Sequence, residues 1–298
     1  MKHFNKFQYI LISIILLSLF TACQENPTYA VYDDRAALID IVSRDYPTLF
    51  ETELIDTDIP DTTAFLKIND FVLLHQWRES IRSGRKYLVN AIYPDSVYAG
   101  NFPEATVTIT DTLQIKYNVM ATDTSANPDT LVRYSTESNE LITVIGRMEK
   151  WGDQYDYRNG WILQESSGTG GGSLLPQSAI ESVILSGSGL GENTYSYDNL
   201  FRLKSLNDID IVGLNETITV SCNVANPNYI VTFHIGRDTF TKVIPQNTDD
   251  NLFEAELNAP GEEGYFHITI DVISHESLES EDNYQFRRLS IPLYAAEW

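Results

Sequence analysis

The chain has 298 residues and is strongly acidic, with 42 Asp and Glu against 20 Lys and Arg and a formal net charge of −22. A charge of this sign and size repels phosphate backbones and anionic lipid, which argues against nucleic-acid binding. With 43% apolar and 11% aromatic residues the chain can bury hydrophobic cores, and its length is typical of two domains.

The first 23 residues have the three-part layout of a secretory signal peptide. Lys2 and Lys6 form a basic start, Ile10–Phe20 is an almost unbroken apolar run, and the small residues Thr21-Ala22 precede Cys23. The apolar run is shorter than the roughly 20 residues that span a bilayer. The pattern therefore predicts an exported protein.

The closing Leu19-Phe20-Thr21-Ala22-Cys23 resembles the lipobox of bacterial lipoproteins, with Phe20 where that motif usually has leucine. The resemblance implies cleavage before Cys23, lipid attachment at Cys23, and an extracytoplasmic protein anchored to a bacterial membrane. Residues 1–22 would then be the signal peptide and 23–30 a polar tether. An ordinary secretory signal with a cysteine near its cut is the alternative. The motif is compatible with the inner and with the outer membrane, and with a protein that faces the periplasm or the cell surface.

Residues 31–167 are predicted to form an α+β domain that begins with two helices. Asp33 and Asp34 stand at the N-cap position of a segment whose apolar residues recur every three or four positions, and Pro47 ends it. The segment from Asp70 to Ile81 has a similar spacing and predicts a second helix.

From Arg85 onward apolar and polar residues alternate, which predicts antiparallel strands, and Asn159-Gly160 is typical of a two-residue hairpin turn. Helices followed by strands and closed by Gly160-Trp161-Ile162-Leu163 resemble the NTF2-like (SnoaL-like) cone. This resemblance implies a curved sheet around a pocket, with Trp77 and Tyr117 as candidate liners. The pocket acids and histidines of that family match no positions here.

Gly168–Ser173, with the sequence GTGGGS, is predicted to be a flexible linker. Residues 174–298 then contain about seven alternating strands separated by turn signals, the pattern of an all-β sandwich. The pattern resembles immunoglobulin-like or fibronectin type III-like domains of bacterial surface proteins, which implies an architecture but no activity. Cys222 lies on the apolar face of one strand without a partner, so no internal disulfide is predicted.

The sequence predicts neither a catalytic nor a metal site. The stretches Gly168–Gly172 and Gly187–Gly191 lack the Lys-Ser/Thr ending of a phosphate-binding loop, and Gly187-Ser188-Gly189 lacks the rest of a nucleophile elbow. His234 and His267 are expected on the outward, solvent-facing sides of their strands, and no His or Cys pair has metal-ligand spacing. We therefore predict no enzymatic activity, no cofactor and no metal.

Aromatic residues around Asn159 form the predicted ligand-binding site. Flat exposed rings can stack on sugars or anchor a protein partner. The candidate residues are Trp151, Tyr155, Tyr157 and Trp161, together with Trp77. Burial of Trp161 and of one tyrosine face in the core is the alternative interpretation.

The sequence as a whole predicts a lipid-anchored, extracytoplasmic binding or assembly protein that is not an enzyme and whose protein or glycan partner is not identified. Two alternatives remain: an NTF2-like small-ligand binder or enzyme with a pocket in the first domain, and a surface glycan-binding lipoprotein. Calcium binding by acidic loops also stays open, for example by the loop with Glu53, Asp56, Asp58 and Asp61.

Overall fold

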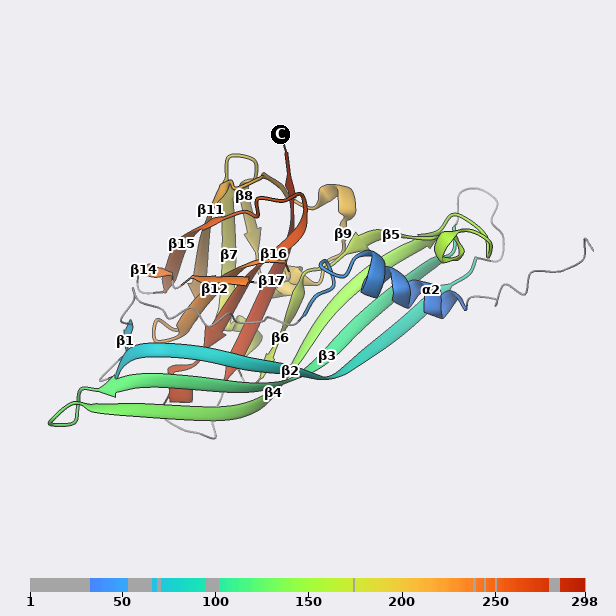
Figure 1. Ribbon diagram of the computed structural model, residues 1–298. Coiled ribbons are helices and arrows are strands. Elements are labelled where there is room, and N and C mark those ends of the chain that lie inside the picture. Colours follow the sequence, from blue (N-terminus) through green and yellow to red (C-terminus); the bar gives the residue numbers. More distant parts are fainter. Residues whose placement is uncertain are drawn as a thin grey trace, which may run out of the picture.

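The structure is a computed structural model, and it describes residues 33–52, 66–68, 71–94, 102–173, 175–237, 240–243, 245–249, 251–278 and 285–297. The predicted signal peptide, the tether and the lipidation residue Cys23 lie outside the described residues. Most of the described chain is antiparallel β-sheet (Figure 1). None of the described helices is long and apolar enough to cross a membrane.

The first helix forms where the sequence predicts it. α2 spans Asp34–Asp40 and continues into a π-helical turn, η1, at Ile41–Asp45. Asp33 caps the helix because its carboxylate accepts a hydrogen bond from the backbone N–H of Arg35 (3.1 Å). The apolar face of this segment is buried in a hydrophobic core that also contains Val107, Ile109, Val144, Met148 and Trp161.

Three long antiparallel strands, β2 (Phe71–Ile92), β3 (Glu104–Asp123) and β4 (Thr130–Lys150), follow and form a curved sheet (Figure 1). The short strand β1 (Leu66–Ile68) pairs with the start of β2.

The second predicted helix is wrong, because Phe71–Ile81 is strand. β2 pairs with β3 from Phe71 opposite Asp123 to Ile92 opposite Glu104, and this continuous cross-strand bonding overrides the helix-like spacing of a few apolar residues. The register of this pairing shifts between Arg82 and Gly84, where β2 has a β-bulge.

The glycine-rich segment is also not a linker. Thr169–Ser173 forms strand β6, which pairs with β4 at Leu141–Thr143 and with β17 (Phe286–Ala296) on its other side. A Cβ atom on Gly171 would overlap the carbonyl oxygen of Leu141 and lie 2.7 Å from the side chain of Ile142. The glycines therefore permit close packing of neighbouring strands, and one sheet runs through the expected boundary at 168–173.

The C-terminal half is a β-sandwich, as the alternating strands predict. One face is a five-stranded sheet in the order β14-β15-β11-β7-β8, and the other belongs to the large sheet, which continues from β6 through β17, β16 and β12 to β13. The strands of the five-stranded sheet are β7 (Ile180–Gly187), β8 (Gly191–Tyr195), β11 (Thr217–Val224), β14 (Gln246–Asp249) and β15 (Leu252–Asn258). Those of the facing sheet are β12 (Ile230–Gly236), β13 (Phe240–Val243) and β16 (Gly264–Ile273), beside β17.

Shorter elements complete the chain. They are β5 (Trp161–Ser166), β9 (Lys204–Ser205), β10 (Ile211–Gly213), α3 (Tyr197–Leu200), and the 3-10 turns η2 (Tyr157–Gly160), η3 (Gln177–Ala179), η4 (Leu206–Asp208) and η5 (His275–Leu278).

The N-terminal half covers the outer face of the sandwich. Both faces of β12 and β16 are buried, one in the sandwich core and the other beneath a second layer. A separate hydrophobic core joins these layers and contains Leu113, Ile115, Tyr117, Ala121 and Ile142 from β3 and β4 together with Ile230, Ile273 and Phe286 from the sandwich. Strands β3 and β4 at one end of the large sheet therefore pack against β12, β16 and β17 at its other end.

Candidate functional site

An exposed group of aromatic side chains gathers at the end of the long sheet where β4 passes into β5. We call Phe102, Trp151, Tyr155 and Tyr157 the aromatic surface. The Trp151 ring is 60% exposed and stacks on Phe102, with ring centroids 5.7 Å apart and an interplanar angle of 25°. Its Nε1–H donates to Glu149 Oε2 (2.9 Å), which fixes the orientation of the indole.

Tyr155 and Tyr157 present their rings from the same loop, and both are 74% exposed. The Tyr157 hydroxyl donates to Asp45 Oδ1 (2.8 Å), and the Arg158 guanidinium lies 4.8 Å from the centroid of the Tyr157 ring. The Tyr157 ring is therefore held on one side by a cation–π contact and at its tip by a hydrogen bond.

Ion pairs to the N-terminal helical segment brace this loop. Arg158 Nη1 lies 2.7 Å from Asp40 Oδ2, while its Nε and Nη2 donate to the two carboxylate oxygens of Asp45 (2.9 and 2.7 Å). Hydrogen bonding from Arg158 lowers the pKa of Asp45, so this carboxylate is ionised at neutral pH. Such bidentate guanidinium–carboxylate pairs fix geometry as well as charge.

A second brace centres on Asp34. Its carboxylate accepts hydrogen bonds from Lys150 Nζ (3.0 Å), Asn159 Nδ2 (3.0 Å) and the Tyr93 hydroxyl (2.6 Å). Partial burial opposes ionisation of Asp34, but the donors outweigh it and lower its pKa to about 2.

The Asn159-Gly160 pair does not form the expected two-residue turn. Lys150 pairs with Trp161 at the base of the hairpin, so the whole of Trp151–Gly160 is the connecting loop. Arg158, Asn159 and Gly160 all have positive φ (52°, 55° and 74°). This left-handed run turns the Arg158 side chain back toward the helical segment.

Two of the predicted site residues do not belong to the aromatic surface. Trp161 is 2% exposed and lies in the hydrophobic core, where its ring meets Tyr93 edge-on at 6.3 Å. The backbone of Trp77 lies in β2 opposite Asn118, and its side chain lies outside the description. Tyr117, the other predicted pocket liner, is buried between the layers.

A group of polar and charged residues that the sequence did not reveal lies between the two layers, with the partly exposed Arg82 and Arg85 at its edge. We call Thr52, Arg82, Arg85, Asp111, His234, Asp271 and Arg288 the buried polar cluster. Asp271 accepts from Arg288 Nε (2.9 Å) and Nη2 (3.3 Å), and its Oδ2 lies 3.2 Å from His234 Nε2. Asp111, which is fully buried, pairs with Arg85 through two bonds (2.7 and 2.6 Å) and with Arg82 Nε (3.1 Å).

Thr52 connects the two parts of this cluster. Its hydroxyl donates to Asp111 Oδ2, and its backbone carbonyl accepts from Arg288 Nη1 (3.3 Å). The segment after the helical turn therefore ties β3 of the outer layer to β17 of the sandwich.

The predicted surface positions of His234 and His267 are wrong. Both residues face away from the sandwich core, as their strand phase requires, but the second layer covers that face and leaves them 2% and 1% exposed. Alternation along a strand identifies the two faces of a sheet, and it does not tell whether another layer packs on the polar one.

His234 contacts the rest of the buried polar cluster through its Nε2 atom, which lies beside Asp271. No serine or cysteine is bonded to His234 in the described part of the chain, and its Nδ1 there has no hydrogen-bond partner. Among the described residues no group of three or more His, Cys, Asp or Glu side chains is placed to hold a metal ion. Cys222 is free and buried in the sandwich core, and burial raises the pKa of its thiol.

Two open hollows lie outside both groups. One of about 330 Å³ lies on the exposed face of β2–β4 and is lined by Glu79, Ile81, Gln114, Ile115, Lys116, Glu137, Ser138 and Asn139. The other, of about 620 Å³, lies at the end of the sandwich and includes Arg237, Thr241, Asn258 and Glu262 in its lining.

Comparisons with known proteins show no family for this chain. No family model matches the chain, and the search of curated proteins finds no match. Among solved structures, a pullulanase from Bacillus acidopullulyticus is similar at 11% sequence identity and a TM-score of 0.18, over 70% of this chain and 29% of that one. A similarity at this level supports neither a shared fold nor a shared activity.

Proposed function

We propose that this protein is a non-catalytic binding or assembly protein that contacts its partner with the aromatic surface. The observation that carries the proposal is the high exposure of Trp151, Tyr155 and Tyr157 on a loop that ion pairs hold in place. Rigid aromatic side chains bind at a low entropic cost and dominate the free energy of many interfaces.

We further propose that the protein acts at a bacterial membrane, on its extracytoplasmic side, through a lipid at Cys23. The support is the basic start, apolar run and lipobox-like ending of Met1–Cys23. A chain with a net charge of −22 is repelled by anionic lipid, and a covalent anchor offsets that repulsion.

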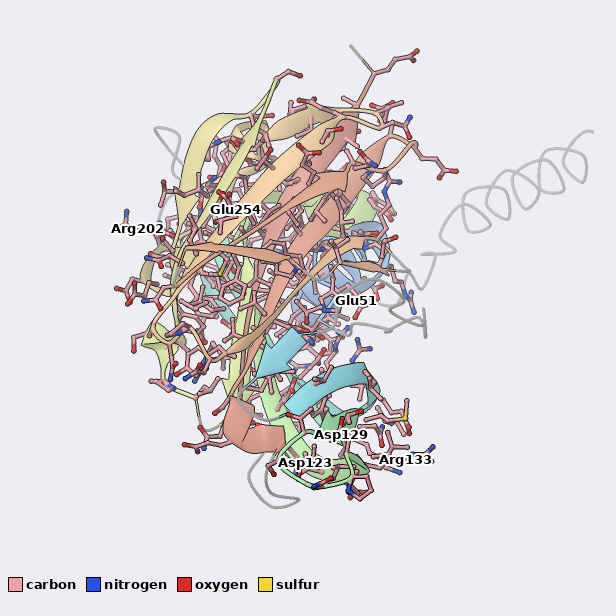
Figure 2. All side chains as sticks on the ribbon, turned by 90° about the vertical axis from the view of Figure 1, so that its left-hand side faces the viewer. Glu51, Asp123, Asp129, Arg133, Arg202 and Glu254 are labelled. Atoms are coloured by element: carbon pink, nitrogen blue, oxygen red, sulfur yellow. The ribbon has the colours of Figure 1, made fainter. Side chains whose placement is uncertain are left out.

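The first test compares Trp151→Ala with Leu131→Ala in full-length tagged protein expressed in the cells that make it. Leu131 is an exposed aliphatic residue (53%) at the opposite end of β4, roughly 60 Å away along the strand. Figure 2 shows that end of the sheet, marked by Asp123, Asp129 and Arg133, projecting from the rest of the molecule.

We expect Trp151→Ala to weaken capture of the partner at least about 30-fold, the effect of losing a contact worth 2 kcal/mol or more, and to leave the melting temperature unchanged. Leu131→Ala should bind like the unmodified chain. Equal binding by all three proteins would exclude the aromatic surface, and a lower melting temperature for Trp151→Ala would make Trp151 a structural residue.

Glycan binding at a cell surface is a second candidate, favoured by one observation. Phe102 and Trp151 stack with 25° between their planes, so the outer faces of the pair are flat apolar surfaces on which a sugar ring can lie, and the carboxylate of Glu149 bonds the Trp151 indole. The same two variants on a glycan array separate this candidate from a protein partner, since only a glycan binder gives a signal there.

A small-ligand site of the NTF2-like kind is a weaker candidate. A helix packed against a curved antiparallel sheet supports it, as does the 330 Å³ hollow, although that hollow lies on the face of the sheet opposite the helix. The immunoglobulin-like character of the sandwich is likewise a proposal, supported by the strand alternation in residues 174–298 and by the two facing sheets.

A further inference from the structure

β2 is the outermost of the three long strands, and most of its free edge has no partner strand among the described residues. β1 pairs only with Phe71, Val72 and Leu73, so the edge from His75 to Ile92 is left open in the described part of the sheet. An open edge presents backbone N–H and C=O groups to which another strand can bind.

The two halves of this edge differ in how they are protected. The first half contains Arg78, Glu79 and Arg82 and ends in a bulge, and charges and bulges are the usual protection of edge strands. The second half contains the uncharged segment Tyr87–Ile92 (YLVNAI), which has no proline and pairs with β3 without a bulge. Its composition is that of a strand which readily pairs with another strand.

Side chains on the outer face of this half are also unusually exposed for apolar residues. Leu88 is 59% and Ile92 is 71% exposed, while Tyr87 and Val89 on the other face are half-buried against the core. An exposed apolar edge of this kind is a predicted site of strand addition.

We propose that β2 of one copy of this chain pairs antiparallel with β2 of a second copy about a two-fold axis at Val89, which joins the two sheets into one. Side chains on the two strands must share faces, so even-numbered residues have to lie opposite even-numbered ones. Centring the axis on Val89 satisfies this condition. It also places Leu88 opposite Asn90 and Lys86 opposite Ile92 of the other copy.

Charge favours a second copy as the occupant. Ile92 lies in one cross-strand row with Glu104 and Glu149. Arg147 forms ion pairs with Glu104, Glu149 and Glu165. One guanidinium thus faces three carboxylates, and this end of the edge is acidic.

Lys86 directly precedes the other end of this segment and lies in a row with Thr110 and Thr143, which carries no acidic residue. In the two-fold arrangement each Lys86 extends the acidic row of the other copy, and the two Lys86 side chains lie at opposite ends of the pairing. The edge is therefore complementary to itself, as a two-fold interface requires.

Single-cysteine variants of the full-length chain, oxidised in the membranes of the expressing cells, test the pairing. The variants are Leu88→Cys, Val89→Cys and Asn90→Cys, with Leu131→Cys as an exposed control at the far end of the sheet. Cys222 is buried and does not compete, and the unmodified chain gives the background. Residues directly opposite each other on paired strands have Cβ atoms about 4.5–5.5 Å apart, close enough for a disulfide after small adjustments.

We expect Val89→Cys to give a reducible band at twice the mass of the chain, in excess of Leu88→Cys and Asn90→Cys, and Leu131→Cys to give none. Adding Leu88→Lys and Asn90→Lys to Val89→Cys should reduce this band at least tenfold, because lysines of the two copies would then face each other. Adding Leu131→Lys instead should leave it unchanged.

Absence of the double-mass band from all three edge variants, in protein with an unchanged melting temperature, would overturn the proposal. A reducible band of a different mass would also overturn it, because the edge would then bind another protein. These outcomes do not depend on the aromatic surface, which no edge variant alters.

Discussion

His267 is a neutral imidazole in the interior of the molecule. It is 1% exposed, its Nε2 has no hydrogen-bond partner among the described residues, and burial lowers its pKa to about 4. An unfolded histidine has a pKa near 6.5. The unfolded chain therefore binds a proton at this residue more readily than the folded chain does.

Stability should consequently depend on pH in a window that His267 defines. Because the folded pKa is the lower one, its contribution is fully present above about pH 6.5 and is lost as the pH falls toward 4, by about 3 kcal/mol in all. We expect the free energy of unfolding, measured with denaturant, to fall over this pH range in the unmodified protein. In His267→Phe it should fall less steeply. The two proteins should give parallel curves between pH 7 and 9, and parallel curves below pH 6.5 as well would contradict the prediction.

At the scale of elements, β6 shows how a glycine-rich sequence can be a strand. The backbones of β4 and β17 lie on both sides of it, and Gly171 fits because it has no Cβ. Gly84, at the bulge on β2, has room for a side chain, because no atom lies within 4 Å of a Cβ built there.

These two glycines form a matched pair for mutation. Gly171→Ala should lower the free energy of unfolding by about 2–3 kcal/mol, because the added methyl group overlaps the backbone of β4. Gly84→Ala should change it by no more than about 0.5 kcal/mol. Chemical denaturation measures both, and equal effects would show that residues 168–173 behave as a flexible connection.

At the scale of the whole molecule, the continuous sheet couples the two halves. β6 pairs with strands of both, and the bonds of Thr52 to Asp111 and Arg288 cross between the layers. A buried guanidinium such as that of Arg288 is stable only while its carboxylate partner Asp271 stays in place.

We therefore expect the chain to unfold in one cooperative transition. Native-state hydrogen exchange should show β3 and β17 losing protection at the same denaturant concentration, and calorimetry should give a single peak. Two separate transitions would mean that the halves fold as independent domains, as the sequence suggested.

The sequence by itself determined the local features whose causes are local. The capped helix at Asp34–Asp40 follows from Asp33 and a short apolar periodicity, and the sandwich strands follow from strict alternation, as in Thr217–Val224. The exposure of Trp151 and Tyr157 fits the predicted aromatic site, and the sequence could not separate these residues from the buried Trp161 nearby.

Only the tertiary structure decided which segments pair and which faces are covered. Phe71–Ile81 became strand because β3 lies beside it, and Gly168–Ser173 became part of a sheet because two other strands enclose it. His234, Asp271 and Arg288 form a network because a second layer covers an alternating face that was expected to meet solvent. Spacing along a chain records the preferences of single residues, whereas pairing and layering depend on segments that are distant in the sequence.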